Sequence, residues 1–398
     1  MLFPIFLLVF MVFVNRYFAG RALFVLSKRL GSTGALPTVS VIVPLYNEGK
    51  GIYDTVMSLL EQDYPSDKLE IVVVDDCSTD DSFAWACKAA RRSPNVTVLK
   101  NPENMGKRRG INHAVRKVRS EIVVSVDSDV VVESNAVRLL VSRFVSPEIA
   151  AVGGRVQVSN PQENWLTKMQ TIKYFFGYEY LKNLERAFSC VMCLSGCLTA
   201  YRRSVLLELE PILEHRSWLG VPIKYGEDRF LTRQIVKAGY KTTLTLDAVC
   251  WTVVPNTLTK YFAQQLRWRR SNLIDFFAGL GHAWRLHPIV AMHWLCLFAV
   301  LLSYPVIIVE NLASGAFWEL AVMHLGVLSL LAAVYWKHTL RLPEERRVHP
   351  LWFLAVVVVM PVTYVLYTPL ALFTLDSSSW ETRVAQPFVS PSKTRTPT

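Results

Sequence analysis

Hydrophobic residues between residues 38 and 255 occur in short continuous runs that amphipathic stretches separate. Four runs have the length and content of buried strands, namely VSVIVPLY, LEIVVVDDCS, VTVLKN and EIVVSVDSDVVV. Helical periodicity lies between them, for example over residues 51–62 and 81–92. Buried parallel strands carry continuous apolar runs, whereas strands with one wet face alternate. The pattern therefore predicts an α/β domain with a parallel sheet that is covered on both faces.

Longer apolar runs replace this pattern in the C-terminal part of the chain. Residues 288–309 and 312–336 are each long enough to cross a bilayer as a helix, and a basic loop over residues 337–348 follows them. At the N-terminus an uncharged stretch is followed by basic residues, which predicts a weak membrane anchor over residues 1–30. We therefore expect a transmembrane region over residues 286–376.

A third apolar run, residues 351–375, is interrupted by Pro361 and Pro369. Proline removes a backbone donor and clashes with the preceding turn of a helix. Such breaks are tolerated at membrane depth only where protein or water satisfies the freed backbone groups. We therefore predict that this segment is broken or re-entrant and that it returns the tail, residues 377–398, to the cytosol. A simple third span with an external tail is the alternative.

The composition agrees with a membrane-associated protein and narrows its partners. Of the 398 residues, 52% are hydrophobic, and the formal net charge is +11. The chain has neither zinc-finger spacing nor a basic run interleaved with aromatics, so no nucleic acid partner is expected, whereas anionic lipid or a phosphorylated substrate is. The seven cysteines are scattered and odd in number, which predicts free thiols rather than a disulfide framework.

Carboxylates follow two of the predicted strands. Asp127 and Asp129 stand two residues apart and can share a divalent cation whose other ligands are phosphate oxygens. Asp75 and Asp76 end another strand, where they can accept hydrogen bonds from the base and ribose of a nucleotide. An Asx turn and a helix N-cap are the structural alternatives. Ligands of parallel sheets bind at the carboxyl ends of the strands, which favours a nucleotide site.

One basic residue and one acidic pair extend this predicted site. Lys107 follows the flexible Gly106 and can meet diphosphate oxygens, although a solvated basic face explains it equally well. Glu227 and Asp228 begin a predicted helix, where acidic residues also stabilise the helix N-terminus. In the functional interpretation Asp228 is a general base, which takes the proton of an acceptor hydroxyl as that oxygen attacks.

The stretch QQLRWRRSN lies where the α/β pattern gives way to the membrane-like pattern. Gln264, Arg267 and Trp268 are spaced i, i+3 and i+4 on a predicted amphipathic helix, so they share one face. Arginine can pair with a leaving diphosphate, and tryptophan offers a flat surface to a sugar ring. Arg269 and Arg270 are expected to point elsewhere, toward lipid headgroups. An ordinary basic interfacial helix is the alternative.

Four motifs precede the predicted membrane spans, in this order: the pair Asp75-Asp76, the DxD motif Asp127 to Asp129, the ED motif Glu227-Asp228, and the QxxRW motif Gln264 to Trp268. Together they resemble the family 2 inverting glycosyltransferases. The processive membrane synthases are the most similar group. GEDRFLT, CLSGCLTAYRR and SSSWETR resemble hyaluronan synthases and the rhizobial chitooligosaccharide synthases. That group has Trp-Gly-Thr-Arg near its end, where this chain has Glu381 in place of glycine. Glu227 is typical of the chitin type.

The resemblance implies a GT-A-like catalytic domain over residues 38–255 and amphipathic interface helices over residues 256–285. It implies a multi-pass protein of the plasma membrane with a cytosolic catalytic domain. The reaction would transfer sugar from a UDP-sugar, UDP-GlcNAc being favoured, to a growing β-linked polysaccharide that is extruded across the lipid bilayer. The alternatives are a single transfer to a lipid-linked or cell-surface acceptor, and a transporter or scaffold with a degenerate nucleotide domain. Nothing in the sequence indicates an oligomeric state.

The resemblance also implies roles for individual residues. The catalytic group comprises Glu227, Asp228, Gln264, Arg267 and Trp268. The group that binds the donor comprises Pro44, Tyr46, Glu48, Asp75, Asp76, Lys107, Asp127, Trp380 and Arg383. Mg²⁺ or Mn²⁺ would be held chiefly by Asp129, with Asp127 in support.

Overall fold

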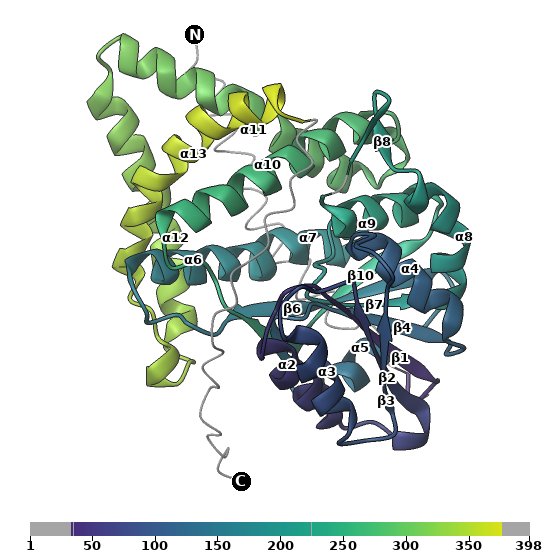
Figure 1. Cartoon of the computed structure of the whole chain (residues 1–398). Helices are drawn as coiled ribbons and strands as arrows, with labels where there is room; N and C mark the ends of the chain where they lie inside the picture. Colours follow the sequence, from purple (N-terminus) through teal and green to yellow (C-terminus); the bar gives the residue numbers. More distant parts are fainter. Residues whose placement is uncertain (1–32, 35, 224, 376–398) are drawn as a thin grey trace.

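The computed structural model describes residues 33–375 except for residues 35 and 224. An α/β domain occupies one side of the molecule and a group of long helices the other (Figure 1). The anchor predicted over residues 1–30 and the tail residues Trp380 and Arg383 lie outside the described residues.

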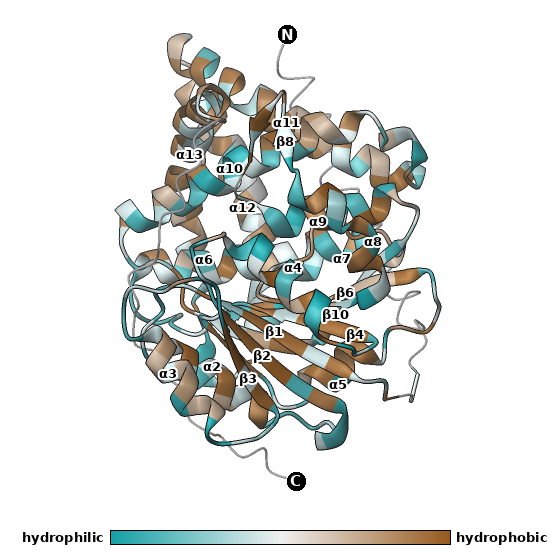
Figure 2. Ribbon diagram, turned by 45° about the vertical axis from the view of Figure 1, so that its right-hand side comes forward, coloured by the Kyte–Doolittle hydropathy of each residue, from teal (hydrophilic) through white to brown (hydrophobic). Residues whose placement is uncertain are grey.

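The α/β domain is built on one eight-stranded sheet with the order β3-β2-β1-β4-β7-β6-β10-β5. Its strands are β1 (Val39–Leu45), β2 (Leu69–Asp75), β3 (Val96–Lys100), β4 (Ile122–Val126), β5 (Val130–Val132), β6 (Ile149–Val158), β7 (Leu198–Arg202) and β10 (Lys241–Thr252). Figure 2 shows hydrophobic residues along the central strands, and every residue of β1 and β4 is buried. The continuous apolar runs of the sequence therefore correspond to strands covered on both faces.

Helices cover both faces of the sheet. They are α2 (Gly51–Leu60), α3 (Ser82–Ala90), α4 (Lys107–Lys117), α5 (Ala136–Val141), α6 (Trp165–Phe176), α7 (Lys182–Ala187), α8 (Arg203–Glu214), α9 (Glu227–Lys237) and α10 (Leu258–Leu280). A π-helical segment, Gly177–Leu181, joins α6 to α7, and a short hairpin pairs β8 (Ser217–Trp218) with β9 (Val221–Pro222). Helices α2, α3 and α5 lie on one face, and α4, α8 and α9 lie on the other (Figure 1).

The order of the strands places a switch point at the carboxyl ends of β1 and β4, and we call the region beside these strand ends the crevice. The chain runs from β1 outward through β2 to β3 and then crosses back to β4 on the other side of β1, and all these strands are parallel. The connections that leave β1 and β4 therefore diverge, and ligands of open α/β sheets bind at such switch points. The carboxyl ends of β1, β2 and β4 lie side by side there.

The predicted parallel pairing is confirmed for β1, β2, β3 and β4, but the complete sheet is mixed. Strand β7 runs antiparallel between β4 and β6, and β5 runs antiparallel to β10. The predicted fourth strand divides after Val126, and β5 turns away to pair with β10. Apolar content is the same on both sides of the break, so only the pairing of distant strands distinguishes one long strand from two.

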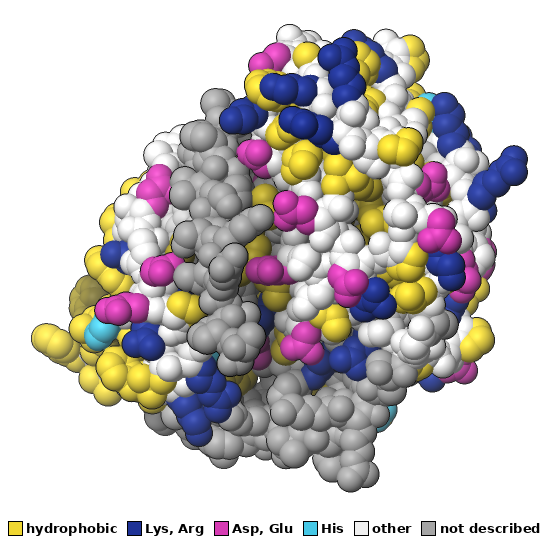
Figure 3. Space-filling model, turned by 90° about the horizontal axis from the view of Figure 1, so that it is seen from below, with side chains coloured by type: hydrophobic (Ala, Val, Ile, Leu, Met, Phe, Trp, Pro, Cys, Tyr) yellow, Lys and Arg dark blue, Asp and Glu magenta, His cyan; other side chains and the backbone are white. Residues whose placement is uncertain are grey.

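Two helices on the other side of the molecule have the length and composition to cross a membrane. Helix α11 (Pro288–Ala313) has 26 residues and α12 (Phe317–Thr339) has 23. A 3₁₀ turn, Ala283–Arg285, precedes α11, and two more, Glu344–Arg346 and Pro350–Phe353, follow α12. Figure 3 shows a face on which acidic and basic side chains are interspersed, while hydrophobic side chains gather at the left margin, the side of α12 in Figure 1.

The third apolar run contains the break that its prolines predict. The backbone bends by 56° between residues 344–356 and 358–373, and the second part belongs to α13 (Leu354–Phe373). The bend lies four residues before Pro361, where a proline ring clashes with a backbone carbonyl. Both Pro361 and Pro369 lie inside α13, which continues through them.

Both ends of this third segment contact the α/β domain. At its start the Phe353 ring packs against Phe176 of α6, with the ring centroids 5.3 Å apart. At its end the carbonyl of Leu375 accepts a hydrogen bond of 2.7 Å from the Tyr225 hydroxyl. The segment therefore begins and ends at the same domain.

Helix α10 packs along α13, which corrects one expectation. The Arg269 guanidinium lies 3.9 Å from the centroid of the Tyr364 ring, and Arg270 Nε donates a 3.0 Å hydrogen bond to Thr374 Oγ1. These two arginines therefore face α13 rather than lipid headgroups. Their side chains join the interface helix to the apolar segment, because guanidinium stacks on aromatic rings and bonds to hydroxyl oxygens.

Candidate active site

Hydrogen bonds join the loops that follow β1 and β2 at the crevice. Asn47 adopts a left-handed backbone conformation, with φ 49°, and its Oδ1 accepts a 2.8 Å hydrogen bond from the amide of Thr79. The amide of Glu48 donates to Ser82 Oγ at 2.7 Å. Of the predicted donor-binding residues here, Tyr46 and Glu48 are partly exposed at the crevice, whereas Pro44 is buried within β1.

Asp75 has a carboxylate oxygen that the described residues do not satisfy. The residue is fully buried at the end of β2, and its Oδ1 accepts a 3.3 Å hydrogen bond from the amide of Ser78. Its Oδ2 is buried and has no hydrogen-bond partner among the residues that the structure describes. A buried acceptor without a donor is costly. An N–H or hydroxyl group of a ligand would satisfy it.

Asp76 has an internal role. Its Oδ1 accepts hydrogen bonds of 2.9 Å from Asn101 Nδ2 and from the amide of Met105, and its Oδ2 accepts one of 2.7 Å from the amide of Gly106. These contacts fix the loop that leads into α4. The sequence predicts Asp76 as a donor ligand, whereas the structure shows that its carboxylate holds the approach to Lys107.

Lys107 is the meeting point of three elements. Its Nζ lies 2.5 Å from Asp127 Oδ1, which follows β4, and 3.0 Å from Glu227 Oε1, at the start of α9. Burial lowers the pKa of Lys107, but the two carboxylates raise it more, so the pKa lies above its ordinary value. Burial raises the pKa of Glu227, yet Lys107 holds that pKa well below the ordinary value. Lys107 and Glu227 are therefore both charged at neutral pH.

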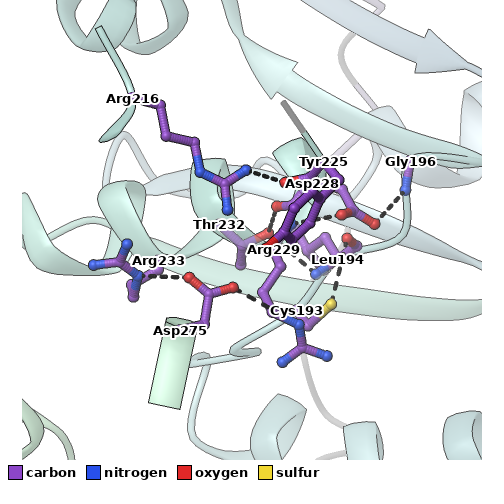
Figure 4. A network of polar contacts seen from close by, with 10 residues as sticks. All are labelled: Cys193, Leu194, Gly196, Arg216, Tyr225, Asp228, Arg229, Thr232, Arg233 and Asp275. Atoms are coloured by element: carbon purple, nitrogen blue, oxygen red, sulfur yellow. Dashed lines mark hydrogen bonds and ion pairs between the residues drawn. The ribbon is translucent and has the colours of Figure 1, made fainter. Parts of the chain in front are cut away.

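The turn before α9 presents Asp228 to the same cluster. Gly226 caps the helix in a left-handed conformation, with φ 67°, which glycine adopts without strain. The amide of Gly196 donates to Asp228 Oδ2 at 3.3 Å, and the amide of Arg229 donates to Oδ1 at 2.8 Å (Figure 4). Unlike Glu227, Asp228 accepts these bonds from backbone groups and has no ion pair with Lys107.

The sequence did not identify Gly196 as a site residue. A Cβ at this position would lie 2.9 Å from Lys107 Nζ, so a side chain would displace the ammonium group. Its amide also orients Asp228. In the sequence, only the position of Gly196 within CLSGC could have indicated a role in the site. Its contact with Lys107 joins two residues that lie far apart in the chain.

The predicted face of α10 borders this cluster. Gln264 is buried, and its Oε1 has no hydrogen-bond partner among the described residues. Arg267 lowers the pKa of Glu227 through its positive charge, so the two groups lie within electrostatic reach. Trp268 is 37% exposed. The start of α9 and α10 are in close contact, because a Cβ on Gly226 would lie 2.0 Å from Ser271 Oγ.

The carboxylates fit a metal that binds together with a substrate. Asp127 and Asp129 stand between β4 and β5, at the crevice. Within the part of the chain that the structure describes, no group of three or more His, Cys, Asp or Glu side chains could hold a metal ion. Mg²⁺ is commonly bound by one or two carboxylates plus substrate phosphates. The residues therefore fit an ion whose remaining ligands come from a diphosphate and water.

Comparison with known proteins identifies relatives over most of the chain. Residues 37–271 match the profile of a family described as Glycosyltransferase like family 2. The chain is 33% identical over 371 residues to an N-acetylglucosaminyltransferase of Rhizobium meliloti (strain 1021), which covers 90% of this chain and 84% of that protein. It is 32% identical to an N-acetylglucosaminyltransferase of Azorhizobium caulinodans, with 87% of each chain covered.

A solved structure shares the fold. It is the mannosyltransferase PcManGT of Pyrobaculum calidifontis in complex with GDP-Man and Mn²⁺, with a TM-score of 0.56 and 23% sequence identity. The similarity covers 89% of this chain and 97% of that one. The expected GT-A-like fold is therefore confirmed.

Replacing Lys107 by methionine should destabilise the protein in a pH-dependent manner. In the wild type the depressed pKa of Glu227 stabilises the fold above the ordinary value of about 4.3, and this contribution is lost as the pH falls through the lower folded value. In Lys107→Met the partly buried Glu227 has no ammonium partner, so its folded pKa rises and the charged form is penalised. We expect a loss on the order of 3 kcal/mol at pH 8 that shrinks toward pH 5.

Thermal unfolding at both pH values measures this difference. The matched control is Lys241→Met, which removes a surface ion pair with Glu148 whose side chains are 52% and 63% exposed. The control should have little effect at either pH. A deficit of Lys107→Met that is equal at pH 5 and pH 8 would contradict the ion-pair interpretation.

Proposed function

This chain belongs to the glycosyltransferase-like family 2, and we propose that it transfers N-acetylglucosamine from UDP-GlcNAc to a growing β-linked glycan, with inversion. The observation that carries the choice of sugar is the 33% identity to the Rhizobium meliloti N-acetylglucosaminyltransferase over 90% of this chain. That similarity includes the crevice and most of the C-terminal helices. Glu227 also favours a chitin-type product over a hyaluronan-type product.

The charges of the crevice support binding of a nucleoside diphosphate. The unsatisfied Oδ2 of Asp75 suits an N–H of the base or a ribose hydroxyl. Lys107 is held in its charged form beside Asp127, and Arg267 adds a second positive charge near Glu227. Such cations stabilise the negative charge that develops on a departing diphosphate. We propose that these groups hold the donor and assist departure of UDP.

Mg²⁺ or Mn²⁺ would be held by Asp129 and Asp127. When bound, the ion would offset negative charge on the diphosphate. The two carboxylates supply part of a hard cation's ligand set, and donor phosphates supply the rest. Asp127 also contacts Lys107, so the ammonium group would orient this carboxylate before the donor arrives.

Asp228 is the better general base of the two adjacent acids. Glu227 is bound to Lys107 and its pKa lies well below the ordinary value, so it is a weak proton acceptor. Asp228 is partly exposed and accepts hydrogen bonds only from backbone amides among the contacts described above. We propose that Asp228 takes the proton of an acceptor hydroxyl. That oxygen forms a bond to the anomeric carbon while the bond to UDP breaks on the opposite face.

The acceptor would lie against α10. Trp268 is 37% exposed and shares a side of α10 with Ser271, which adjoins the start of α9, and aromatic faces provide stacking surfaces for sugar rings. Helix α10 stands between the α/β domain and the apolar helices (Figure 1). We propose that the growing end stays at Trp268 while the glycan passes toward the bilayer, which makes successive transfers possible. The catalytic domain would then be cytosolic, at the plasma membrane.

The tail would begin on the catalytic side. Helices α11 and α12 form a pair that returns the chain to the side on which it started, if both span the bilayer. The bent third segment contacts the α/β domain at both ends, through Phe353 and Leu375. These contacts support a re-entrant segment. We propose that Trp380 and Arg383 therefore belong to the cytosolic side, where they can act at the donor site.

The reaction can be tested with purified protein and defined donors. Incubation with UDP-GlcNAc alone should give a product that chitinase digests, and chelation with EDTA should abolish its formation until Mg²⁺ or Mn²⁺ is restored. Addition of UDP-GlcA should not make the product sensitive to hyaluronidase. Gel filtration should show products that contain several sugars. A product with one added sugar would favour single transfer, and turnover of UDP-glucose but not of UDP-GlcNAc would refute the proposed donor.

Asp228→Asn tests the base. Asparagine retains the size of the side chain but cannot accept the proton, so we expect turnover to fall at least ~100-fold while UDP affinity is retained. Turnover is measured as UDP release and affinity by calorimetry. Asp67→Asn is the matched control, because this exposed residue precedes β2 at the opposite end of the strand from Asp75. Turnover of Asp228→Asn within tenfold of the control would exclude Asp228 as the base.

The sidedness of the tail can be measured by cysteine labelling in cells. A cysteine introduced at Ser378 should react with a membrane-impermeant thiol reagent only after the cells are permeabilised. A cysteine at Ser314, in the exposed turn between α11 and α12, should react in intact cells if both helices cross the bilayer. Labelling at position 378 in intact cells, together with full activity of Trp380→Ala, would show that the tail is outside and is not part of the site.

A further inference from the structure

A buried carboxylate on α10 binds the helix that carries the proposed base. Asp275 is 4% exposed, and its Oδ1 accepts a 2.9 Å hydrogen bond from Arg233 Nε (Figure 4). Its Oδ2 lies 3.8 Å from Arg229 Nε. Both arginines belong to α9, whose first two residues are Glu227 and Asp228. The mechanism proposed above does not use this network.

The contact belongs to one stripe of α10. Gln264, Trp268, Ser271 and Asp275 are spaced i, i+4, i+7 and i+11, so they lie along one side of the helix. Ser271 packs closely against Gly226 at the start of α9. Asp275 binds Arg229 and Arg233, which lie about one and two turns further along α9. Two contacts on one stripe fix both the distance and the rotation of α10 relative to α9.

The turn that presents Asp228 depends on the same surroundings. Arg216 donates a hydrogen bond to the carbonyl of Tyr225, one residue before Gly226, and its charge also acts on Asp275. On the other side of α9, the hydroxyl of Thr232 donates to the carbonyl of Asp228 at 2.7 Å and accepts from the amide of Leu194 at 3.1 Å. Helix α9 is thus held between the Leu194 loop and Asp275 (Figure 4).

Loss of the Asp275 charge would leave neighbouring guanidinium groups to repel one another. Arg216, Arg229 and Arg233 all act electrostatically on Asp275. In a buried site such repulsion is weakly screened, and removal of one partner of a buried ion pair is strongly unfavourable. The arginines would separate, and α9 would move relative to α10.

We propose that Asp275 is a positioning residue that sets the alignment of the base Asp228 with the acceptor surface at Trp268. This inference rests on the proposed function, since it assigns Asp228 and Trp268 the roles argued there. Asp275 itself touches neither donor nor acceptor. It acts through Arg229 and Arg233, and its effect is on transfer to a glycan hydroxyl rather than on donor binding.

The donor sugar can be transferred either to the glycan or to water. The ratio of these two reactions distinguishes a positioning role of Asp275 from a role in the stability of the fold. Water can replace the glycan hydroxyl at the anomeric carbon, and the same bond to UDP then breaks with release of free sugar. Water needs no alignment on α10, whereas the glycan does. A misaligned site therefore loses transfer more than hydrolysis, while partial unfolding lowers both in proportion.

The test compares Asp275→Asn with wild type and with Asp63→Asn. Asp63 binds Arg138 at the surface, and its side chain is 64% exposed, so it controls for loss of an aspartate–arginine pair. Glycan formation, free sugar release and the donor KM are measured separately. We expect the ratio of transfer to hydrolysis to fall about tenfold or more in Asp275→Asn, since displacement by about 1 Å can cost about 100-fold. The donor KM should be nearly unchanged, and Asp63→Asn should resemble wild type.

Two further variants separate charge from folding. Asp275→Glu retains the negative charge and should keep most of the ratio. Arg233→Gln in the Asp275→Asn background removes the excess positive charge and should recover part of the ratio, because contacting residues are energetically coupled. Equal losses of transfer and hydrolysis in every Asp275 variant, or an unchanged ratio, would overturn the inference.

Amide hydrogen exchange tests the role of Asp275 in holding α9 without requiring glycosyl transfer. If the wild type transfers no N-acetylglucosamine, the proposed function fails, but amide exchange still reports on α9. The amide of Phe230 donates to the carbonyl of Gly226 in the first turn of α9. Exchange over residues 227–233 should be faster in Asp275→Asn than in Asp63→Asn. Equal exchange in the two variants would show that Asp275 does not hold the helix.

Discussion

The positive charge of Lys107 is the interaction on which the rest of the crevice depends. Asp127 comes from the end of β4 and Glu227 from the start of α9, and Lys107 Nζ lies 2.5 Å from the first carboxylate and 3.0 Å from the second. The ammonium group satisfies both and so fixes the distance between the sheet and α9. Asp76 supports this arrangement, because its carboxylate accepts hydrogen bonds from the amides of Met105 and Gly106, the two residues before Lys107. The residues proposed to bind the metal, the diphosphate and the acceptor proton are therefore held in register by one side chain.

Helix α10 transmits this arrangement to the apolar helices. One stripe contacts α9 through Ser271 and Asp275, and other positions contact α13 through Arg269 and Arg270. The helix is thus fixed on two sides, which suits an element that would hold the growing end of a glycan beside a bilayer. The apolar clusters that join α6, α10, α12 and α13 reinforce the connection, because burying aromatic and aliphatic side chains is favourable wherever water is excluded.

The sequence predicted those strands, acidic residues and helix faces whose structure depends on neighbouring residues in the chain. The strands β1, β2 and β3, the acids that follow β2 and β4, and the helical face that carries Gln264 and Trp268 each depend on fewer than about twenty neighbouring residues. The antiparallel strands β5 and β7 did not emerge, because their direction is set by partners far away in the chain. For the same reason Gly196 was not identified, and the hydrogen bonds that Asp76 accepts from Asn101, Met105 and Gly106 did not emerge from the sequence.

Helical geometry explains how two adjacent acids can have different roles. Successive residues of an α-helix point about 100° apart, so Glu227 and Asp228 cannot both face Lys107. Glu227 faces the ammonium group, which holds the pKa of this carboxyl well below its ordinary value. Asp228 is directed toward the amide of Gly196, at the border of the crevice with α10. Under the proposed function, one helix start would supply a fixed charge on the donor side and a proton acceptor on the acceptor side. The ion pair with Lys107 ties Glu227 to the donor side, so a movement of α9 relative to α10 would chiefly change the position of Asp228 relative to Trp268.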